Sequence, residues 1–437
     1  MSARVVVIGG GIGGTVAALA LARAGVETVV VERGERLGGL VAAFEVGGTP
    51  LECFYHHIFP PEREIQDLIA EFGLRSRLGW YPSTVGIFTD GRLWPFTTPL
   101  DLVRFGPLPV TDRLRTGLAA LRLGRVDRWE PLDAVPARDW LAAQTGRRSA
   151  EVVWEPLLRA KFGPAADLVP AAWMWARFRQ RAAARGRGGE RLGYLRGGFR
   201  QLFDAMAGEL GRLGAEVRTA TRVGSIAVAE GGVQGVEVDH EMVEADSVVF
   251  TGPLPALASL VPPEAADPRW TAIGALGVLC AVIELRRQVT DVYWTNVCDP
   301  TLPFGGVIEH TNLVPASDYG RHLMYVSRYF THDEPIAATD PAAETARWVE
   351  RLDHHYPGFS AGDVLAVHPF RTDYAAPLVR LGHLTRLSPM TSHIRGLFVS
   401  TTAQIYPQDR GMNEAARMGK VAAQSALAHL QQREALA

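Results

Sequence analysis

Three glycines near the N-terminus have the spacing of a phosphate-binding loop. They form the pattern Gly9-x-Gly11-x-x-Gly14, which directly follows a run of β-branched residues. Gly9 permits a tight turn, Gly11 lets the backbone approach a pyrophosphate, and Gly14 lets a helix pack closely against a strand. Glu32 stands 18 residues after Gly14, where a carboxylate accepts hydrogen bonds from ribose hydroxyls. The set predicts a dinucleotide-binding site, and the alternative is a tight strand–helix turn without a ligand.

A second glycine pair follows the acidic residue, in a segment that contains Arg33, Arg36, Gly38, Gly39 and Leu40. This segment resembles the pattern of the FAD-dependent amine oxidase and protoporphyrinogen oxidase superfamily. In that superfamily the arginine and the glycine pair line the phosphates and the ring of the flavin, an element that a nicotinamide dehydrogenase does not need. The resemblance implies FAD, held noncovalently, as the cofactor. An ordinary loop is the alternative interpretation of the same residues.

The C-terminal segment adds a second helix start that faces the same ligand. Gly411 and Met412 open a helix that we expect to reach about Leu430. The positive end of a helix dipole stabilises negative charge at the N1–C2 carbonyl region of a flavin, although an ordinary capped helix is the alternative. The resemblance to the amine oxidase and protoporphyrinogen oxidase superfamily implies that the backbone of Val223 contacts the adenine. The expected cofactor-binding residues are therefore Gly9, Gly11, Ile12, Gly13, Gly14, Glu32, Arg33, Arg36, Gly38, Gly39, Leu40, Val223, Gly411 and Met412.

Two adjacent histidines are the candidates for catalytic proton transfer, because histidine exchanges a proton near neutral pH. His56 and His57 lie in the segment Tyr55–Phe59. This segment, together with the run Gly91–Leu100, resembles UDP-galactopyranose mutase. The resemblance implies that His57 lies near the isoalloxazine ring and that His56 takes the place of a glycine. The alternative is that one of the pair hydrogen-bonds the backbone and only shapes the pocket.

Three further residues are candidate substrate contacts: Lys161, Arg371 and Tyr374. Lys161 is one of two lysines among 45 basic residues, and it either binds an anionic substrate or forms a structural ion pair, for example with Glu155. Arg371 and Tyr374 lie in a run that resembles the segment of the oxidases that approaches the flavin from the substrate domain. A stretch from Arg181 to Gly189 is either a basic lid over an anionic substrate or a solvated linker.

The elements that must position these residues indicate a Rossmann-type fold. Arg4–Ile8 and Glu27–Val31 are β-branched runs typical of buried parallel strands, and Ile12–Arg23 between them predicts a helix. The expected fold class is α/β, with a GR2-like, Rossmann-type FAD-binding domain and a discontinuous α+β substrate domain. We expect the FAD-binding domain to comprise residues 1–80, 196–255 and 386–437. The helical block 81–195 and the sheet-rich block 256–385 would form the substrate domain.

Composition limits the other possibilities. The chain has 437 residues, of which 47% are hydrophobic, and a formal net charge of −2, so no overall positive charge draws it to nucleic acid. Cys53, Cys280 and Cys298 are far apart, and neither they nor the histidines form a metal-binding motif. No signal peptide or spanning helix fits the sequence, so we expect a cytoplasmic protein. The stretch Leu100–Leu123 either touches a membrane surface peripherally or packs on the core.

These observations favour one function over two alternatives. The preferred function is that of an FAD-dependent oxidoreductase, an oxidase or dehydrogenase that transfers hydride from a small organic or lipophilic substrate to flavin N5. The first alternative is a non-redox, flavin-dependent mutase of a nucleotide sugar. The second is a non-enzymatic binding protein similar to GDP-dissociation inhibitors. The intact glycine loop counts against the second alternative, because a scaffold need not keep a phosphate site.

Overall fold

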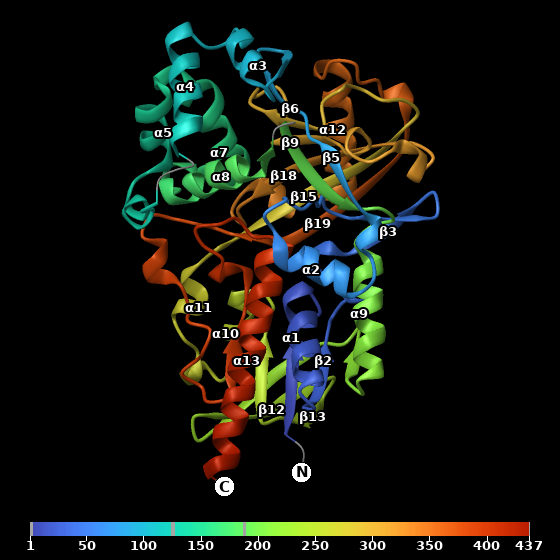
Figure 1. Ribbon diagram of the computed structural model, residues 1–437, viewed down its shortest axis with the longest axis vertical. Helices are drawn as coiled ribbons and strands as arrows, with labels where there is room; N and C mark the ends of the chain where they lie inside the picture. Colours follow the sequence, from blue (N-terminus) through green and yellow to red (C-terminus); the bar gives the residue numbers. More distant parts are fainter. Residues whose placement is uncertain (1–2, 124–126, 187–188, 437) are drawn as a thin grey trace.

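The computed structural model describes residues 3–123, 127–186 and 189–436. Both ends of the chain lie beside a five-stranded parallel sheet in the lower half of Figure 1. In spatial order its strands are β10 (Glu216–Arg218), β2 (Glu27–Val31), β1 (Arg4–Ile8), β14 (Ser247–Phe250) and β20 (Leu397–Val399). Every neighbouring pair is parallel. The sheet therefore joins strands from the N-terminal, central and C-terminal parts of the chain.

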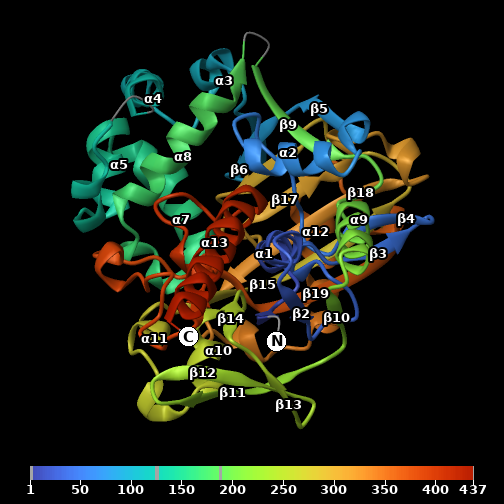
Figure 2. The same ribbon diagram turned by 60° about the horizontal axis from the view of Figure 1, so that its bottom comes forward.

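Both faces of this sheet are covered, which explains its continuous apolar strands. Val5 and Val7 of β1 belong to the core on one face, and Val6 and Ile8 belong to the core on the other. Three helices cover the first face: α1 (Ile12–Arg23), α9 (Arg200–Arg212) and α13 (Met412–Leu436). A small antiparallel sheet covers the second face, seen at the bottom of Figure 2: β11 (Val223–Ala229), β12 (Gly232–Val238) and β13 (Glu241–Glu244).

A second, seven-stranded sheet lies above the first one in Figure 1. In spatial order its strands are β19 (Val364–Pro377), β15 (Ala275–Leu285), β18 (His322–Phe330), β17 (Gly306–Glu309), β16 (Trp294–Val297), β6 (Val85–Thr89) and β7 (Arg92–Pro95). Only the pairing of β16 with β6 is parallel among the neighbours in this sheet of the described chain. That pairing joins the two blocks that we expected to form the substrate domain.

A helical layer stands beside this sheet, in teal and green in Figure 1. Its helices are α3 (Pro99–Arg104), α4 (Val110–Leu123), α5 (Ala137–Thr145), α6 (Arg147–Ser149), α7 (Glu155–Phe162) and α8 (Ala171–Ala184). The remaining elements are α2 (Arg63–Glu71), α10 (Leu254–Leu260), α11 (Arg269–Ala272), α12 (Pro341–His355), the hairpin β3 (Ala43–Val46) and β4 (Thr49–Glu52), and the strands β5 (Leu78–Pro82), β8 (Arg185–Gly186) and β9 (Gly189–Leu195).

The structure differs from the sequence-based expectation in two places. The stretch from Arg181, for which a solvated linker was one alternative, instead continues α8 as far as Ala184, because its alanines favour a helix, and then enters the β8–β9 hairpin. Arg181 itself lines the cavity described below, so the alternative of a basic lid stays a prediction. Arg187 and Gly188 of that stretch lie outside the described residues. Helix α13 ends at Leu436, beyond the expected Leu430. The domain boundaries at residues 80, 195, 255 and 385 remain our proposal. Across the described parts of the chain, no helix combines the length and apolar character needed to cross a bilayer.

Candidate functional site

A cavity of about 1600 Å³ extends from the five-stranded sheet to the helical layer. The last residues of β1, β2 and β14 line it, so it opens at the carboxyl edge of the sheet, where α/β folds bind their ligands. Its lining includes the predicted cofactor residues other than Gly14, both candidate histidines and all three candidate substrate residues. Residues that are far apart in the sequence therefore share one space.

The first glycine loop connects β1 to α1 and requires residues without side chains. Gly9 has φ +107°, a conformation that side chains disfavour. A Cβ atom at Gly14 would lie 1.9 Å from the carbonyl oxygen of Gly9, so only glycine lets the helix begin this close to the strand. Gly11 and Gly13 line the cavity at the start of α1. A helix start with exposed backbone amides attracts a phosphate group.

Glu32 follows β2 and is held at the rim of the cavity by two backbone amides. Its carboxylate accepts hydrogen bonds from Gly10 N at 2.6 Å and from Gly34 N at 2.7 Å. A carboxylate has about four acceptor sites, so capacity remains for ribose hydroxyls.

The second glycine pair lies directly against the first glycine loop. Gly38 N donates to the carbonyl oxygen of Gly10 at 2.9 Å, and a Cβ atom at Gly39 would lie 3.1 Å from the Cα of Gly11. Gly38 and Gly39 have φ +145° and +57°, which favour glycine. The two glycine segments therefore form one backbone-lined cradle. Arg33, Arg36 and Leu40 also line the cavity beside it.

Two later segments complete this part of the cavity. Val223 begins β11, and Gly411 precedes Met412 at the start of α13; all three line the cavity. Helices α1 and α13 meet closely here, because a Cβ atom at Gly13 would lie 3.1 Å from the carbonyl oxygen of Ala415. Backbone amides for a pyrophosphate, an acid for a ribose and a second helix start fit the requirements of FAD.

The two histidines lie in the cavity wall and are neutral at neutral pH. His56 Nδ1 donates to the carbonyl oxygen of Phe54 at 2.7 Å, so His56 Nε2 carries the lone pair. His57 Nδ1 lies 3.1 Å from the hydroxyl of Tyr293. Burial lowers the pKa of His56 to about 4, and burial together with the charge of Arg181 lowers the pKa of His57 to about 3. Both imidazoles are therefore weak bases.

Lys161 belongs both to an ion pair and to the cavity lining. Its Nζ lies 2.6 Å from Asp409 Oδ2, whereas Glu155, the partner considered from the sequence, pairs with Arg138 at 2.6 Å. Burial lowers the pKa of Lys161 to about 7, even though the charge of Asp409 opposes this shift. The amine thus titrates near neutral pH within the cavity.

Arg371 and Tyr374 lie on β19 at the edge of the same cavity. The guanidinium of Arg371 donates to the backbone carbonyl oxygens of Ala337 and Thr339 and lies 3.1 Å from Asp373 Oδ1. Most of its donors are thereby occupied by the protein. Tyr374 has an exposed fraction of 36%, and its ring packs edge-on against the ring of His332.

Several cavity residues were not expected from the sequence, among them Thr251, Tyr293, Trp294 and Tyr329. Thr251 Oγ1 lies 3.1 Å from the carbonyl oxygen of Gly9 and so supports the glycine turn. Its position directly after the apolar run Ser247–Phe250 was an available signal, because the ends of such strands meet at the ligand edge of the sheet. Tyr293 and Trp294 offered no local signal, since the pairing of β16 with β6 brings them to the cavity.

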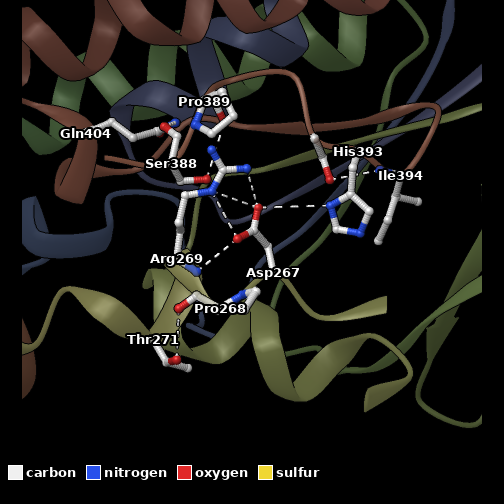
Figure 3. A network of polar contacts seen from close by, with 10 residues as sticks. Asp267, Pro268, Arg269, Thr271, Ser388, Pro389, His393, Ile394 and Gln404 are labelled. Atoms are coloured by element: carbon white, nitrogen blue, oxygen red, sulfur yellow. Dashed lines mark hydrogen bonds and ion pairs between the residues drawn. The ribbon is translucent and has the colours of Figure 1, made fainter. Parts of the chain in front are cut away.

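A separate polar cluster lies outside the cavity (Figure 3). Asp267 accepts a hydrogen bond from Arg269 Nη2 at 2.6 Å, and His393 Nδ1 lies 4.0 Å from the same carboxylate. This cluster connects the segment before α11 to the segment before β20, so its geometry is that of a structural contact. Within the described residues, no group of three or more His, Cys, Asp or Glu side chains is arranged to hold a metal ion.

Comparison with known proteins defines the class of this site. The family model described as flavin containing amine oxidoreductase matches residues 12–427. The protein belongs to this family of flavin-dependent oxidoreductases. The predictions of an FAD-dependent oxidoreductase and of FAD as its cofactor are thereby confirmed. A 15-cis-phytoene desaturase of Solanum lycopersicum is 29% identical over 157 residues, which are 32% of this chain and 27% of that one. The match thus spans about a quarter of the length of that relative.

Solved structures show the same fold along the whole chain. A protein from Exiguobacterium sp. 255-15, provisionally described as a protoporphyrinogen oxidase, has a TM-score of 0.77 and 21% identity, with 99% of each chain covered. Reduced UDP-galactopyranose mutase has a TM-score of 0.75 and 14% identity, with 98% of this chain and 96% of that chain covered. The predicted fold class and the resemblance to this superfamily are confirmed.

Proposed function

We propose that the protein is an oxidase or dehydrogenase that removes hydride from a carbon atom of a small, lipophilic molecule. The supporting observation is the cavity of about 1600 Å³, whose lining extends from the glycine cradle to exposed leucines of α4. When bound, FAD supplies the hydride acceptor, its N5 atom. The chain supplies the binding, the orientation and the exclusion of water.

The leucines at the opening support a lipophilic substrate. Leu114, Leu118 and Leu121 of α4 line the cavity, and their exposed fractions are 63%, 49% and 64%. Burial of one such side chain against an apolar ligand stabilises the complex by roughly 1.5–3 kcal/mol. An apolar molecule would therefore cover surface that now faces water.

In this proposal each cofactor residue has one task. The start of α1, with Gly11 and Gly13, binds the pyrophosphate, and Glu32 accepts the ribose hydroxyls. The start of α13, at Gly411 and Met412, faces the flavin and favours negative charge there. His56 and His57 line the cavity and would lie beside the ring of a bound flavin, where His56 Nε2 or the imidazole of His57 would accept a proton from the substrate. The pKa values of about 4 for His56 and about 3 for His57 make both imidazoles weak bases, so a role in positioning the substrate is better supported than a role in accepting its proton.

We further propose that α3 and α4 touch a membrane surface peripherally. The large apolar side chains exposed on these helices are Leu100, Val103, Val110, Leu114, Leu118 and Leu121. Arginines on the same helices, such as Arg104 and Arg122, would face anionic headgroups. Flotation with anionic liposomes tests this contact. Protein that stays entirely in the unbound fraction would exclude it.

Anaerobic bleaching of the flavin absorption tests the proposed function. The FAD-loaded protein is mixed with lipophilic alcohols, amines and acids, and loss of the long-wavelength flavin band reports hydride transfer. We expect at least one compound to bleach the flavin, and methyl branching near its reactive carbon to slow the reaction. Holoprotein that binds such compounds without ever being bleached would contradict an oxidase or dehydrogenase.

A further inference from the structure

Two cationic side chains pair with one carboxylate inside the cavity, and a third cationic side chain lies next to that carboxylate in the sequence, where α7 and α8 approach the start of α13. Lys161 Nζ lies 2.6 Å and Arg177 Nη2 lies 2.8 Å from Asp409 Oδ2. Arg410 Nη2 donates to the Tyr329 hydroxyl at 3.0 Å. All five residues line the cavity. We refer to Lys161, Arg177 and Arg410 as the cationic cluster.

Among the ion pairs of the described residues, Asp409 is the one carboxylate that contacts Lys161 and Arg177, and none contacts Arg410. Burial alone would raise the pKa of Asp409, but the charges of Arg177, Lys161 and Arg410 hold it well below its usual range, so Asp409 stays ionised. One carboxylate against two arginines and a lysine whose pKa is about 7 leaves a net positive charge. Arg410 Nε is buried and has no hydrogen-bond partner among the described residues. Buried charges and donors are costly unless they are paired, so this arrangement calls for a further anion.

Aromatic side chains and short contacts hold the cations in place before any ligand arrives. Lys161 Nζ lies 4.8 Å and the guanidinium carbon of Arg177 lies 4.7 Å from the centre of the Trp173 ring. The side chain of Lys161 is only 13% exposed. Fixed donors in a partly dry pocket bind an anion with little loss of side-chain entropy.

We propose that the cationic cluster binds an anionic group of the substrate, while the apolar part of the substrate lies toward the leucines of α4. This inference rests on the proposed function and deepens it, because it makes the substrate an amphipathic acid. An alkylammonium group would instead meet the net positive charge of the cationic cluster, and like charges repel. A carboxylate and a phosphate share the required chemistry.

Ligands that differ only in their polar group test the proposal on FAD-loaded, oxidised protein. Octanoate, octyl phosphate, octylamine and octanol are titrated, and binding is followed by the flavin difference spectrum and by calorimetry. We expect at least one of the two anions to bind about tenfold more tightly than octylamine, and the comparison of octanoate with octyl phosphate identifies the better headgroup. Lys161→Met and Arg177→Met should each weaken anion binding about tenfold and change octanol binding less than twofold.

Arg159→Met is the matched control, because Arg159 lies on the same helix, is 56% exposed and pairs with Asp167 at 3.7 Å outside the cavity. It should leave all four affinities unchanged, and Lys161→Arg should retain anion binding. Octylamine that binds as tightly as both anions would overturn the proposal without any variant. Unchanged anion affinity in Lys161→Met and Arg177→Met would also overturn the proposal. This holds even if both variants change the flavin reduction potential, because such a change would show that the cations act on the flavin and not on a substrate anion. The titrations measure binding and need no turnover. A protein that binds the anions but is never bleached would contradict the proposed function alone, and a protein that shows no preference for the anions would contradict the cationic-cluster proposal.

Discussion

The two ends of the cavity are built from different parts of the protein. At the cofactor end, backbone atoms of Gly9, Gly11, Gly38 and Gly39 form the surface, and the residues lie within forty positions of the N-terminus. At the substrate end, side chains from α4, α7, α8, β18 and the segment before α13 form the surface. The first end depends on the absence of side chains, and the second depends on their charge and apolar character. We therefore expect substitutions at the first end to remove the cofactor and substitutions at the second to change ligand preference.

The largest effect should come from Gly14→Val. The new Cβ would lie 1.9 Å from the carbonyl oxygen of Gly9, and overpacking of this kind costs roughly 1–3 kcal/mol or more. We expect purified protein with little or no bound FAD. Gly208→Ala on α9 is the control, since its Cβ would meet no atom within 4 Å. Full FAD occupancy in Gly14→Val would show that the glycine loop does not set the cofactor site.

A smaller loss at the same end should follow from Glu32→Ala. This change removes the acceptor for Gly10 N and Gly34 N and the proposed ribose contact. Hydrogen bonds to a charged group contribute roughly 1.5–3 kcal/mol each, so the Kd for FAD should rise about ten- to a hundredfold. Fluorescence titration of the FAD-free protein measures this constant. An unchanged Kd would mean that Glu32 serves only the turn.

At the substrate end, the pH dependence of anion binding should follow Lys161. Its pKa is lowered to about 7 by burial, and Asp409, Arg177, Arg410 and Tyr329 are the charged or titratable groups that face it. The protonated amine is the form that attracts an anion. Affinity for octanoate should therefore be highest near about pH 6, where the amine is protonated and the ligand carboxylate is still ionised, and should fall up to about tenfold as the pH rises above 7. A flat profile in the wild type, or the same decline in Lys161→Met, would contradict this assignment.

The half-buried histidines of the cavity wall, His56 and His57, should make stability depend on pH in the acidic range. His56 and His57 have folded pKa values of about 4 and 3, below the unfolded value near 6.5, so the unfolded state binds protons first. Between pH 6.5 and these folded pKa values, the free energy of unfolding should fall by up to about 1.4 kcal/mol per histidine for each pH unit. Denaturant unfolding between pH 7 and pH 5 measures the slope, and His57→Phe should reduce it. A histidine NMR signal that titrates near pH 6.5 and disappears in His57→Phe would contradict the lowered pKa.

The smallest effect on stability should come from the leucines at the opening. Leu118→Ser changes a side chain that is 49% exposed, so the free energy of unfolding should change by no more than about 0.5 kcal/mol. Leu141→Ala on α5 is the contrast, because Leu141 is fully buried and its loss should cost roughly 2–5 kcal/mol. Thermal or denaturant unfolding compares the two. A Leu118→Ser variant as unstable as Leu141→Ala would mean that α4 packs on the core.

The same difference explains what the sequence could predict. Gly9, Gly14 and Glu32 were recognisable because the backbone of a pyrophosphate site imposes residue types at fixed spacing, and α1 was predicted from Ile12 to Arg23 as it occurs. The partner of Lys161 was not predictable, because Asp409 is 248 positions away and meets it only through the packing of α7 on the segment before α13.

An amphipathic pattern does not by itself determine whether its apolar side chains lie in the core or on the surface. The apolar residues of Leu100–Leu123 suited a core or a surface, and in the structure several of them are exposed beside the cavity. The positive charge of Arg371 was evident from the sequence, but the sequence could not predict that backbone carbonyl oxygens would accept hydrogen bonds from the Arg371 guanidinium. The exposure of these leucines and the partners of this arginine depend on how distant strands and helices pack, and the local spacing of residues does not determine that packing.

The most direct test of the account is the visible absorption of the purified protein before and after acid precipitation. The purified protein should show bands near roughly 375 and 450 nm, the spectrum of an oxidised flavin, in a one-to-one ratio with the chain, and the flavin should be fully recovered in the acid supernatant. That result would establish noncovalent FAD in the cavity. A colourless protein that takes up no added FAD would contradict it, and with it every role proposed for the cavity.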